Sequence, residues 1–389
     1  MKIEPALLAA LSVLLGAFVV ASVAPAASTA PVQAVTVQVG PTRLLSPTFG
    51  YTVAYRTVDR NHHVKSTLGV FVYDHGSWRN VTPPHLHADG IDDIAFLDSR
   101  HGWMAAYNCA KVSVYLYRTS DGGHSWQSLG AKAEHSCGGG PTWLSFVDQE
   151  HGWMEPVSPN GPVGVLLRTR DGGQTWMSLA SLERNLPCLA PIAFVSHTAG
   201  WMGRCDGHVY STRDGGRRWR TSSIRVARSP EEQQLDVPRF FGRIGVEAVT
   251  LGKAVPANRS SLRERAVAFS VSMDGGRSWR LRSERRVTPC TQYGGTFYPS
   301  SWPAGIAGRS VWWVVSSGLK PLVQITNDAG RAWHTVVPRG LPRRACAVTS
   351  VSAANNHVAW VVARSSVYDS GLYETRDGGR TWRRITLLR

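Results

Sequence analysis

The sequence predicts an all-β fold, a seven-bladed β-propeller of four-stranded antiparallel blades that spans about residues 35–389. A word built on Asp-Gly-Gly with a Trp a few residues later recurs six times, at intervals of 43 to 60 residues. Between the copies, short apolar runs with alternating polarity predict strands, and no sustained helical period occurs. Repeats of this length are typical of propeller blades, because each blade is one supersecondary unit.

The repeated word is interpreted as the turn between the third and fourth strands of each blade. Its Asp accepts backbone N–H groups of the turn, its glycines supply positive φ, and its Trp packs into the sheet. In one copy Ala329 stands at the first glycine position, so that position tolerates substitution and the second glycine position is the stricter one. A site is normally built once, and one carboxylate per copy is too few for a calcium cage. The Asp and Trp positions are Asp121 and Trp126, Asp171 and Trp176, Asp214 and Trp219, Asp274 and Trp279, Asp328 and Trp333, and Asp377 and Trp382.

A shorter copy, "VYDHGSW" at Asp74, raises the number of units to seven. A second word, as in "FVDQEHGWM", precedes three of the copies, and "VAWVV" has the same place in the last unit. That last unit holds four strand-like segments, in "CAVTSVSA", "HVAWVVAR", "GLYETR" and "TWRRITLL". Because it is complete, we expect the ring to close with only a short N-terminal strand, residues 35–39, beside the last blade.

The two words together resemble a known family. The pattern T-x-D-G-G-x-T-W resembles the Asp-box of BNR-repeat propellers in the sialidase superfamily. The pattern F-x-D-x-x-x-G-W is similar to the photosystem II stability/assembly factor type of that repeat. The resemblance covers about residues 35–389. It implies a non-catalytic binding or assembly scaffold for a protein partner, without a cofactor.

The alternative function is a sialidase-like or other glycoside hydrolase, because propellers of this kind also include glycosidases. Sialidases need an arginine triad, a tyrosine nucleophile with a glutamate partner, and an aspartic acid. The N-terminal F-R-I-P type of word is absent from this sequence, and seven blades depart from the six of that family. No catalytic residue is therefore predicted.

The N-terminal segment predicts export. Residues 6–24 form an apolar run without a charge, and small residues follow near Ala26 and Ala30. Residues 1–30 are thus either a signal peptide or a membrane anchor, and both place the remainder outside the cytoplasm.

The cysteines fit an oxidising compartment, because their number is even and no CxxC spacing occurs. All six are expected on the face opposite the Asp-box turns, where ligands usually meet a propeller. Near-neighbour pairing there would join Cys109 to Cys137, Cys188 to Cys205, and Cys290 to Cys346, with the other fourteen arrangements left open.

The net charge of +16 is concentrated in one half of the chain. Residues 1–200 carry 13 Lys and Arg against 14 Asp and Glu, whereas residues 201–389 carry 30 against 13. This excess predicts an acidic partner, either a protein, another anionic macromolecule or a membrane surface; the alternative is a merely solvated surface. Nucleic acid is not expected for an exported protein, and a monomer is expected.

The predicted docking surface lies on the same face as the cysteines, in four long loops: residues 221–238, 251–265, 283–303 and 338–344. Its candidate arginines are Arg263, Arg265, Arg285, Arg286, Arg343 and Arg344. Four histidines of the first unit are weak candidates for a metal site, because their spacing matches no compact site: His62, His63, His85 and His87.

Overall fold

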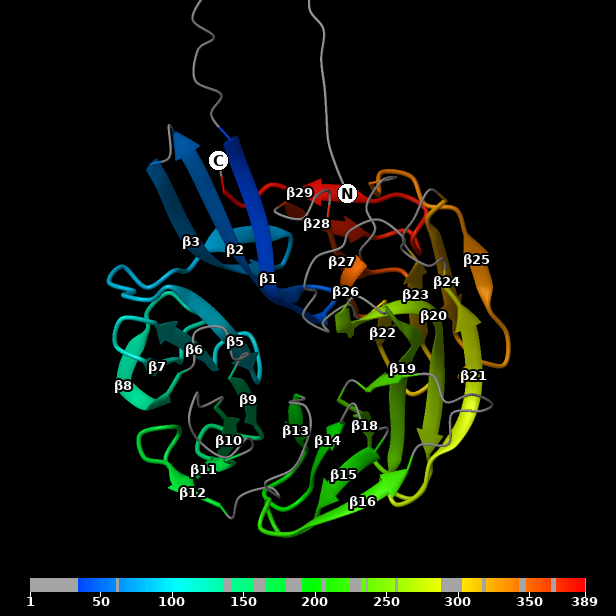
Figure 1. The fold of residues 1–389 in the computed structure, drawn as a ribbon, viewed down its shortest axis with the longest axis horizontal. Helices are drawn as coiled ribbons and strands as arrows, with labels where there is room; N and C mark the ends of the chain where they lie inside the picture. The colour runs from blue at the N-terminus through cyan, green and yellow to red at the C-terminus, as the bar shows by residue number, and fades with distance from the viewer. Residues whose placement is uncertain are drawn as a thin grey trace, which may run out of the picture.

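A computed structural model describes most of the chain after residue 33. The described residues are 34–60, 63–135, 142–156, 165–179, 191–203, 208–223, 232–235, 237–255, 258–287, 303–316, 320–342, 348–364 and 369–388. They form 29 strands in seven antiparallel sheets, which radiate from a common centre as the blades of a ring (Figure 1). The predicted seven-bladed propeller is therefore confirmed.

The blades follow one another in chain order. Blades one to four are β1 (Ala34–Ser46), β2 (Phe49–Arg60), β3 (His63–Asp74) and β4 (Ser77–Asn80); β5 (Gly90–Phe96), β6 (Gly102–Asn108), β7 (Ser113–Thr119) and β8 (Gln127–Glu134); β9 (Trp143–Phe146), β10 (Gly152–Glu155), β11 (Leu167–Thr169) and β12 (Met177–Ser178); and β13 (Ile192–Phe194), β14 (Gly200–Gly203), β15 (His208–Thr212) and β16 (Trp219–Ser223). Blades five to seven are β17 (Glu232–Leu235), β18 (Arg239–Phe241), β19 (Ile244–Val255), β20 (Asn258–Ser272) and β21 (Arg280–Arg286); β22 (Ala304–Ile306), β23 (Trp312–Ser316), β24 (Leu322–Thr326) and β25 (His334–Val336); and β26 (Val348–Ala353), β27 (Ala359–Arg364), β28 (Ser370–Thr375) and β29 (Arg383–Ile385).

The two repeated words meet on one face of the ring. In blade three, the first glycine of the Asp-box donates its N–H to the carbonyl of Glu150 in the turn between β9 and β10, at 2.8 Å. The corresponding bond in blade seven runs from Gly378 to His357 at 3.1 Å, and in blade one from His75 to Thr48 at 2.8 Å. We call this face the Asp-box face, and the face that carries the connections between blades the opposite face.

The core lies between the blades. Trp103 of β6 is fully buried and stacks on Phe146 of the next blade, with ring centroids 3.8 Å apart, and Phe146 meets Trp176 edge-on at 6.2 Å. The Trp103 indole also donates to the carbonyl of Gly172 at 2.9 Å, which fastens the two blades together. Because each aromatic group is shared by neighbours, no blade completes its core alone. The same grouping recurs as Trp153, Phe194 and Trp219, and as Trp201, Phe240 and Trp279.

Ring closure differs from the prediction of a short extra strand beside the last blade. The N-terminal segment is a 13-residue strand, β1, which pairs with β2 as the first strand of blade one. Contacts that involve side chains join blades one and seven. The Leu44 N–H donates to Ser352 Oγ at 2.8 Å, and the ring of Trp360 in β27 packs against that of Trp78, tilted by 31° with centroids 4.9 Å apart. Trp78 belongs to the degenerate copy at Asp74, so that copy keeps its aromatic residue for closure.

Three of the predicted loops are partly strand. Residues 251–265 mostly continue β19 and β20, which pair with each other along almost their whole length. β17, inside the predicted loop 221–238, pairs with β19, and β21 extends to Arg286. Charged residues alternate with less exposed ones along β21, so the high charge marks the solvent side of a strand rather than a loop.

The predicted N-terminal targeting segment lies outside the described residues. Within the described part of the chain, no helix has the length and apolar character needed to cross a membrane.

Candidate functional site

The polar side chains of an Asp-box turn form hydrogen bonds within that turn, as blade three illustrates. Thr169 Oγ1 donates to Asp171 Oδ1 at 2.7 Å, and the Gly173 N–H donates back to Thr169 Oγ1 at 2.9 Å. The backbone N–H of Thr175 donates to Asp171 Oδ1 at 2.9 Å, and its hydroxyl to Oδ2 at 2.5 Å. Both carboxylate oxygens therefore serve the turn.

This bonding holds the boxes in their ionised form. Slight burial raises the pKa of Asp171, but the hydrogen bonds from Thr175 and Thr169 outweigh it and lower the pKa to about 2. Asp121 behaves alike, since bonds from Ser125 and Thr119 overcome slight burial and lower its pKa to about 2. The lowered pKa values keep the Asp171 and Asp121 carboxylates ionised, and in that form they accept the hydrogen bonds that stabilise the turns.

The hydroxyl two positions before each Asp has a role that sequence reasoning missed. It accepts the N–H of the second glycine in all six boxes, at 2.7–3.0 Å. The signal was available, since every copy has Ser or Thr at that position. These residues are Thr119, Thr169, Thr212, Ser272, Thr326 and Thr375.

The predicted arginine patch is only partly visible. Arg285 lies in β21, where its Nε donates to Gln324 Oε1 at 2.6 Å and its guanidinium covers the Trp333 ring at 5.3 Å. It therefore belongs to the contact between blades five and six, and not to an exposed loop. Arg286, also in β21, is exposed. Arg343 and Arg344, and the side chains of Arg263 and Arg265 in β20, lie outside the described residues.

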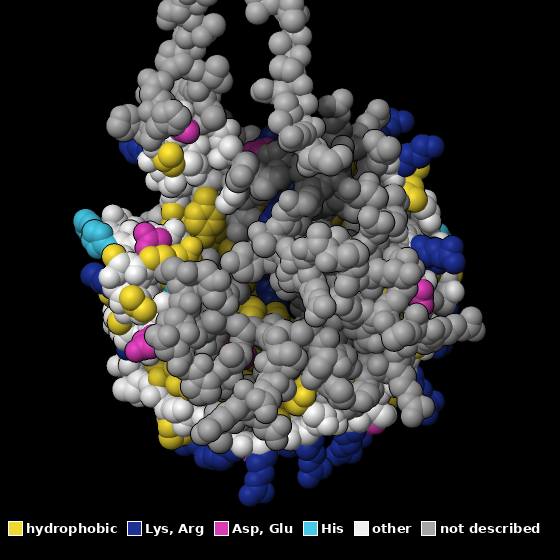
Figure 2. All heavy atoms as spheres, in the orientation of Figure 1, with side chains coloured by type: hydrophobic (Ala, Val, Ile, Leu, Met, Phe, Trp, Pro, Cys, Tyr) yellow, Lys and Arg dark blue, Asp and Glu magenta, His cyan; other side chains and the backbone are white. Residues whose placement is uncertain are grey.

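Other arginines form much of the described basic surface. They lie on the Asp-box turns and outer strands of blades four to seven, and Figure 2 shows Lys and Arg side chains gathered along the rim of the disc. The sequence predicted the charge excess but assigned it to loops of the opposite face. Exposed members of this rim are Arg217, Arg220, Arg277, Arg282, Arg331, Arg380 and Arg383. Arg339, also exposed, lies after β25 within the predicted loop 338–344.

The cysteine and histidine predictions fall mostly outside the described residues. Cys109, which follows β6 as expected, is not a free cysteine, and the other five lie outside the described part, so the three pairs stay a prediction. His85 and His87 are exposed and belong to no three-ligand group among the described residues. His62 and the side chain of His63 lie outside the described part.

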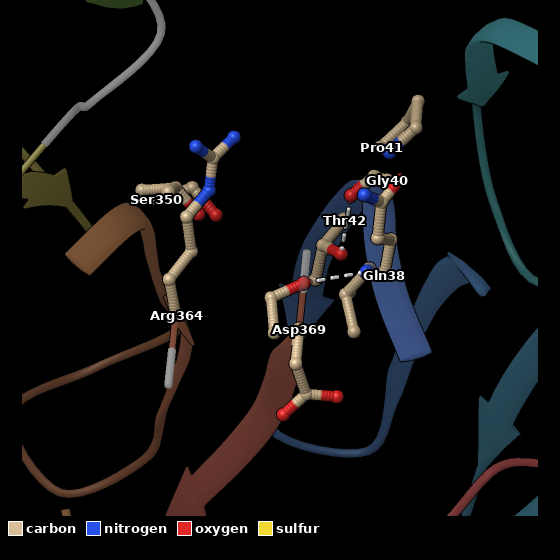
Figure 3. A pocket seen from close by; sticks show the side chains of 10 residues that line it. Gln38, Gly40, Pro41, Thr42, Ser350, Arg364 and Asp369 are labelled. Atoms are coloured by element: carbon tan, nitrogen blue, oxygen red, sulfur yellow. Dashed lines mark hydrogen bonds between the residues drawn. The ribbon is translucent and has the colours of Figure 1, made fainter. Parts of the chain in front are cut away.

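A pocket of about 370 Å³ lies where blade seven meets blade one. Arg364 ends β27 and Ser370 begins β28, so the pocket opens toward the opposite face, away from the Asp-box turns. Figure 3 shows Arg364 and Ser350 across from a segment of β1 that includes Gln38 and Thr42. Burial lowers the pKa of Arg364. The walls combine backbone, hydroxyl, amide and guanidinium groups, which suit hydrogen bonding to a polypeptide.

The same pocket offers little for glycoside hydrolysis. Its described lining contains one carboxylate, Asp369, whereas the usual mechanisms take two. One oxygen of Asp369 accepts the Val37 N–H at 3.1 Å, and Ser370 Oγ accepts the Val39 N–H at 2.8 Å. Both side chains hold β1 against blade seven, which assigns them to ring closure.

These features define the class: the protein is an Asp-box β-propeller whose repeated motif builds its turns and whose candidate binding pocket lies at the ring closure. The family model described as "Photosynthesis system II assembly factor YCF48" matches residues 72–226, from the end of blade one through blade four. The match confirms the resemblance to assembly factor-like propellers. No curated protein matches.

This chain is similar to several solved structures. YCF48 from Cyanidioschyzon merolae is 18% identical, with 77% of this chain and 86% of that chain covered and a TM-score of 0.50. A structure titled "YCF48 bound to D1 peptide" is 19% identical, with 76% and 82% covered and a TM-score of 0.45. The GH74 xyloglucanase from Xanthomonas campestris is 15% identical, with 90% and 62% covered and a TM-score of 0.39. At these identities the likeness concerns the fold alone.

Proposed function

We propose that this protein is an exported, non-catalytic scaffold that binds an acidic protein partner during assembly of a larger complex, in the manner of a photosystem II assembly factor. The family match over residues 72–226 supports the kind of function. The apolar segment at residues 6–24 supports export. The excess of 30 Lys and Arg over 13 Asp and Glu in residues 201–389 supports an acidic partner.

The observation that carries the docking site is the pocket between blades seven and one. The Asp171 carboxylate of the Asp-box face is taken up by its own turn, whereas the pocket offers Arg364, Ser350 and Gln38 in a hollow of about 370 Å³ on the opposite face. A segment of the partner occupies this pocket. The arginine rim attracts the acidic partner from a distance and speeds its approach.

The test is a pull-down from the native envelope fraction with the tagged protein. Ser350→Trp fills the pocket, and Gln174→Trp places the same bulk on an exposed Asp-box turn as the matched control. We expect Ser350→Trp to lower partner recovery at least tenfold and the control to leave it unchanged. Recovery by the wild type falls from about 0.1 M to about 1 M salt, because the Debye length shrinks from about 10 Å to about 3 Å. Equal recovery by all three folded proteins rules out the pocket, and no specific recovery by the wild type rules out the scaffold.

A further inference from the structure

Three potential metal ligands converge on the Asp-box face between blades three and four. Asp148 and His151 belong to the turn before β10, and His197 belongs to the turn before β14. The distance from Asp148 to His151 Nδ1 is 3.0 Å, and from Asp148 to His197 Nε2 is 2.5 Å. Among the described residues this is the only group of three such side chains whose ligand atoms all lie within 4.8 Å of one another.

The turn structure explains the Asp148 side chain and leaves the His197 side chain unexplained. Asp148 Oδ1 accepts the backbone N–H groups of Glu150 and His151, at 2.9 and 2.7 Å, so it shapes its own turn. In blade four, Ser196 Oγ takes that role toward the Thr198 and Ala199 N–H groups. The His197 imidazole is not needed for either turn, yet it points at the Asp148 carboxylate.

A second copy within the chain shows what the third ligand adds. In blade two, Asp98 and His101 repeat the Asp–His pair at 2.9 Å. By alignment of the repeated words, the neighbouring position that holds His197 in blade four holds Gln149 in blade three. The pair is therefore a feature of the repeat, and the histidine opposite it is specific to the boundary of blades three and four.

Arg168 holds the backbone of His197 in place. The buried Arg168 donates from Nη2 to the His197 carbonyl at 3.1 Å and lies over the Trp153 ring at 5.2 Å. The rings of His151 and His197 are 4.0 Å apart. The side chains of Asp148 and His197 are 41% and 54% exposed, so an ion reaches them from solvent without opening the fold.

We propose that Asp148, His151 and His197 bind a divalent transition-metal ion of the zinc class and so link blades three and four. Two imidazoles and one carboxylate suit zinc, cobalt or nickel, whereas calcium and magnesium prefer oxygen ligands alone. Tetrahedral ligands about 2.1 Å from zinc lie roughly 3.4 Å apart, so the two distances from the Asp148 carboxylate to the imidazole nitrogens need to widen by less than about 1 Å. Three protein ligands leave a coordination position for water.

The test uses metal-free full-length protein titrated with Co²⁺, followed by its visible absorption, and with Zn²⁺, followed calorimetrically. His197→Gln removes the third ligand from an exposed position, and His101→Gln is the matched control, since it removes a histidine from the pair that lacks a third ligand. We expect wild type and His101→Gln to bind alike and His197→Gln to bind at least tenfold more weakly. Gln149→His completes the site of blade two and adds one equivalent of bound metal.

The outcomes separate this site from other histidines in the chain. Unchanged affinity in a folded His197→Gln variant places the metal elsewhere and overturns the proposal. Absence of saturable binding by the wild type at about 1 mM Zn²⁺ also overturns it. Loss of affinity in His197→Gln together with a second equivalent in Gln149→His supports both the site and its geometry.

Discussion

The two glycines of an Asp-box differ in how they tolerate a side chain, and blade seven gives the cleanest comparison. Gly378 and Gly379 are adjacent and have φ of +71° and +80°, so an alanine at either adopts a left-handed conformation. That conformation costs about 1–2 kcal/mol for a residue with a Cβ. The surroundings then decide the difference between the two substitutions.

At Gly378 an added Cβ meets nothing closer than the Asn356 carbonyl at 3.4 Å, which is ordinary contact. At Gly379 it lies 2.8 Å from a methyl group of Val323 and 3.3 Å from the Trp313 ring, both fully buried in blade six. Val323 is β-branched and cannot turn away. Overpacking of this kind costs about 1–3 kcal/mol beyond the backbone term. We therefore expect Gly378→Ala to lower the free energy of unfolding by about 1–2 kcal/mol, and Gly379→Ala to lower it by about 2–5 kcal/mol.

The assay is urea unfolding of both variants and the wild type, with the midpoints compared at equal m-value. Blade six provides a natural precedent, because Ala329 occupies the first glycine position with φ of +59°. Equal losses in the two variants, or a larger loss in Gly378→Ala, would refute the reasoning that the second glycine is strict because it packs against the preceding blade.

Three further predictions concern the boxes and the ring. Asp171→Ala should lower the free energy of unfolding by about 1–3 kcal/mol and leave partner capture by the folded protein unchanged. The control Gln174→Ala, on the same turn, should change neither the free energy of unfolding nor partner capture. Loss of capture by Asp171→Ala at an unchanged melting temperature would contradict the structural role of the Asp-box. Because the pKa of Asp171 is lowered to about 2, its contribution to stability is present above about pH 4 and is lost as pH falls toward 2, so the difference in melting temperature between wild type and Asp171→Asn should narrow over that range. Trp360→Ala should cost about 3–5 kcal/mol in chemical unfolding, and more than Trp176→Ala, since Trp360 is fully buried and Trp176 only half-buried; the reverse order would contradict the closure described here.

The repeats made the fold predictable from the sequence. Asp-box turns and alternating strands are local features, so six clear copies and the remnant at Asp74 were enough to count the blades. Ring closure was not predictable in the same way. It depends on contacts such as that of Trp360 with Trp78, which join the first and last blades. Local sequence periodicity does not reveal contacts between residues so far apart in the chain.

The candidate site was harder to predict than the fold. The pocket draws residues from β1, β26, β27 and β28, which only the closed ring brings together. The placement of Arg285 in a loop was wrong, because the outer strand β21 is rich in charged residues, as surface loops are. Its side chain turns back onto Gln324 and Trp333, and that contact appears only when the neighbouring blade is present.

The central claim is that the Asp-box face holds the scaffold together while the opposite face binds a protein. Site-specific photo-crosslinking in the native envelope tests it most directly, with the crosslinker at Gln38, exposed beside the pocket, or at Gln174, exposed on an Asp-box turn. The account predicts a crosslinked partner from Gln38, weakened by high salt, and none from Gln174. A partner captured from Gln174 and not from Gln38 would contradict it.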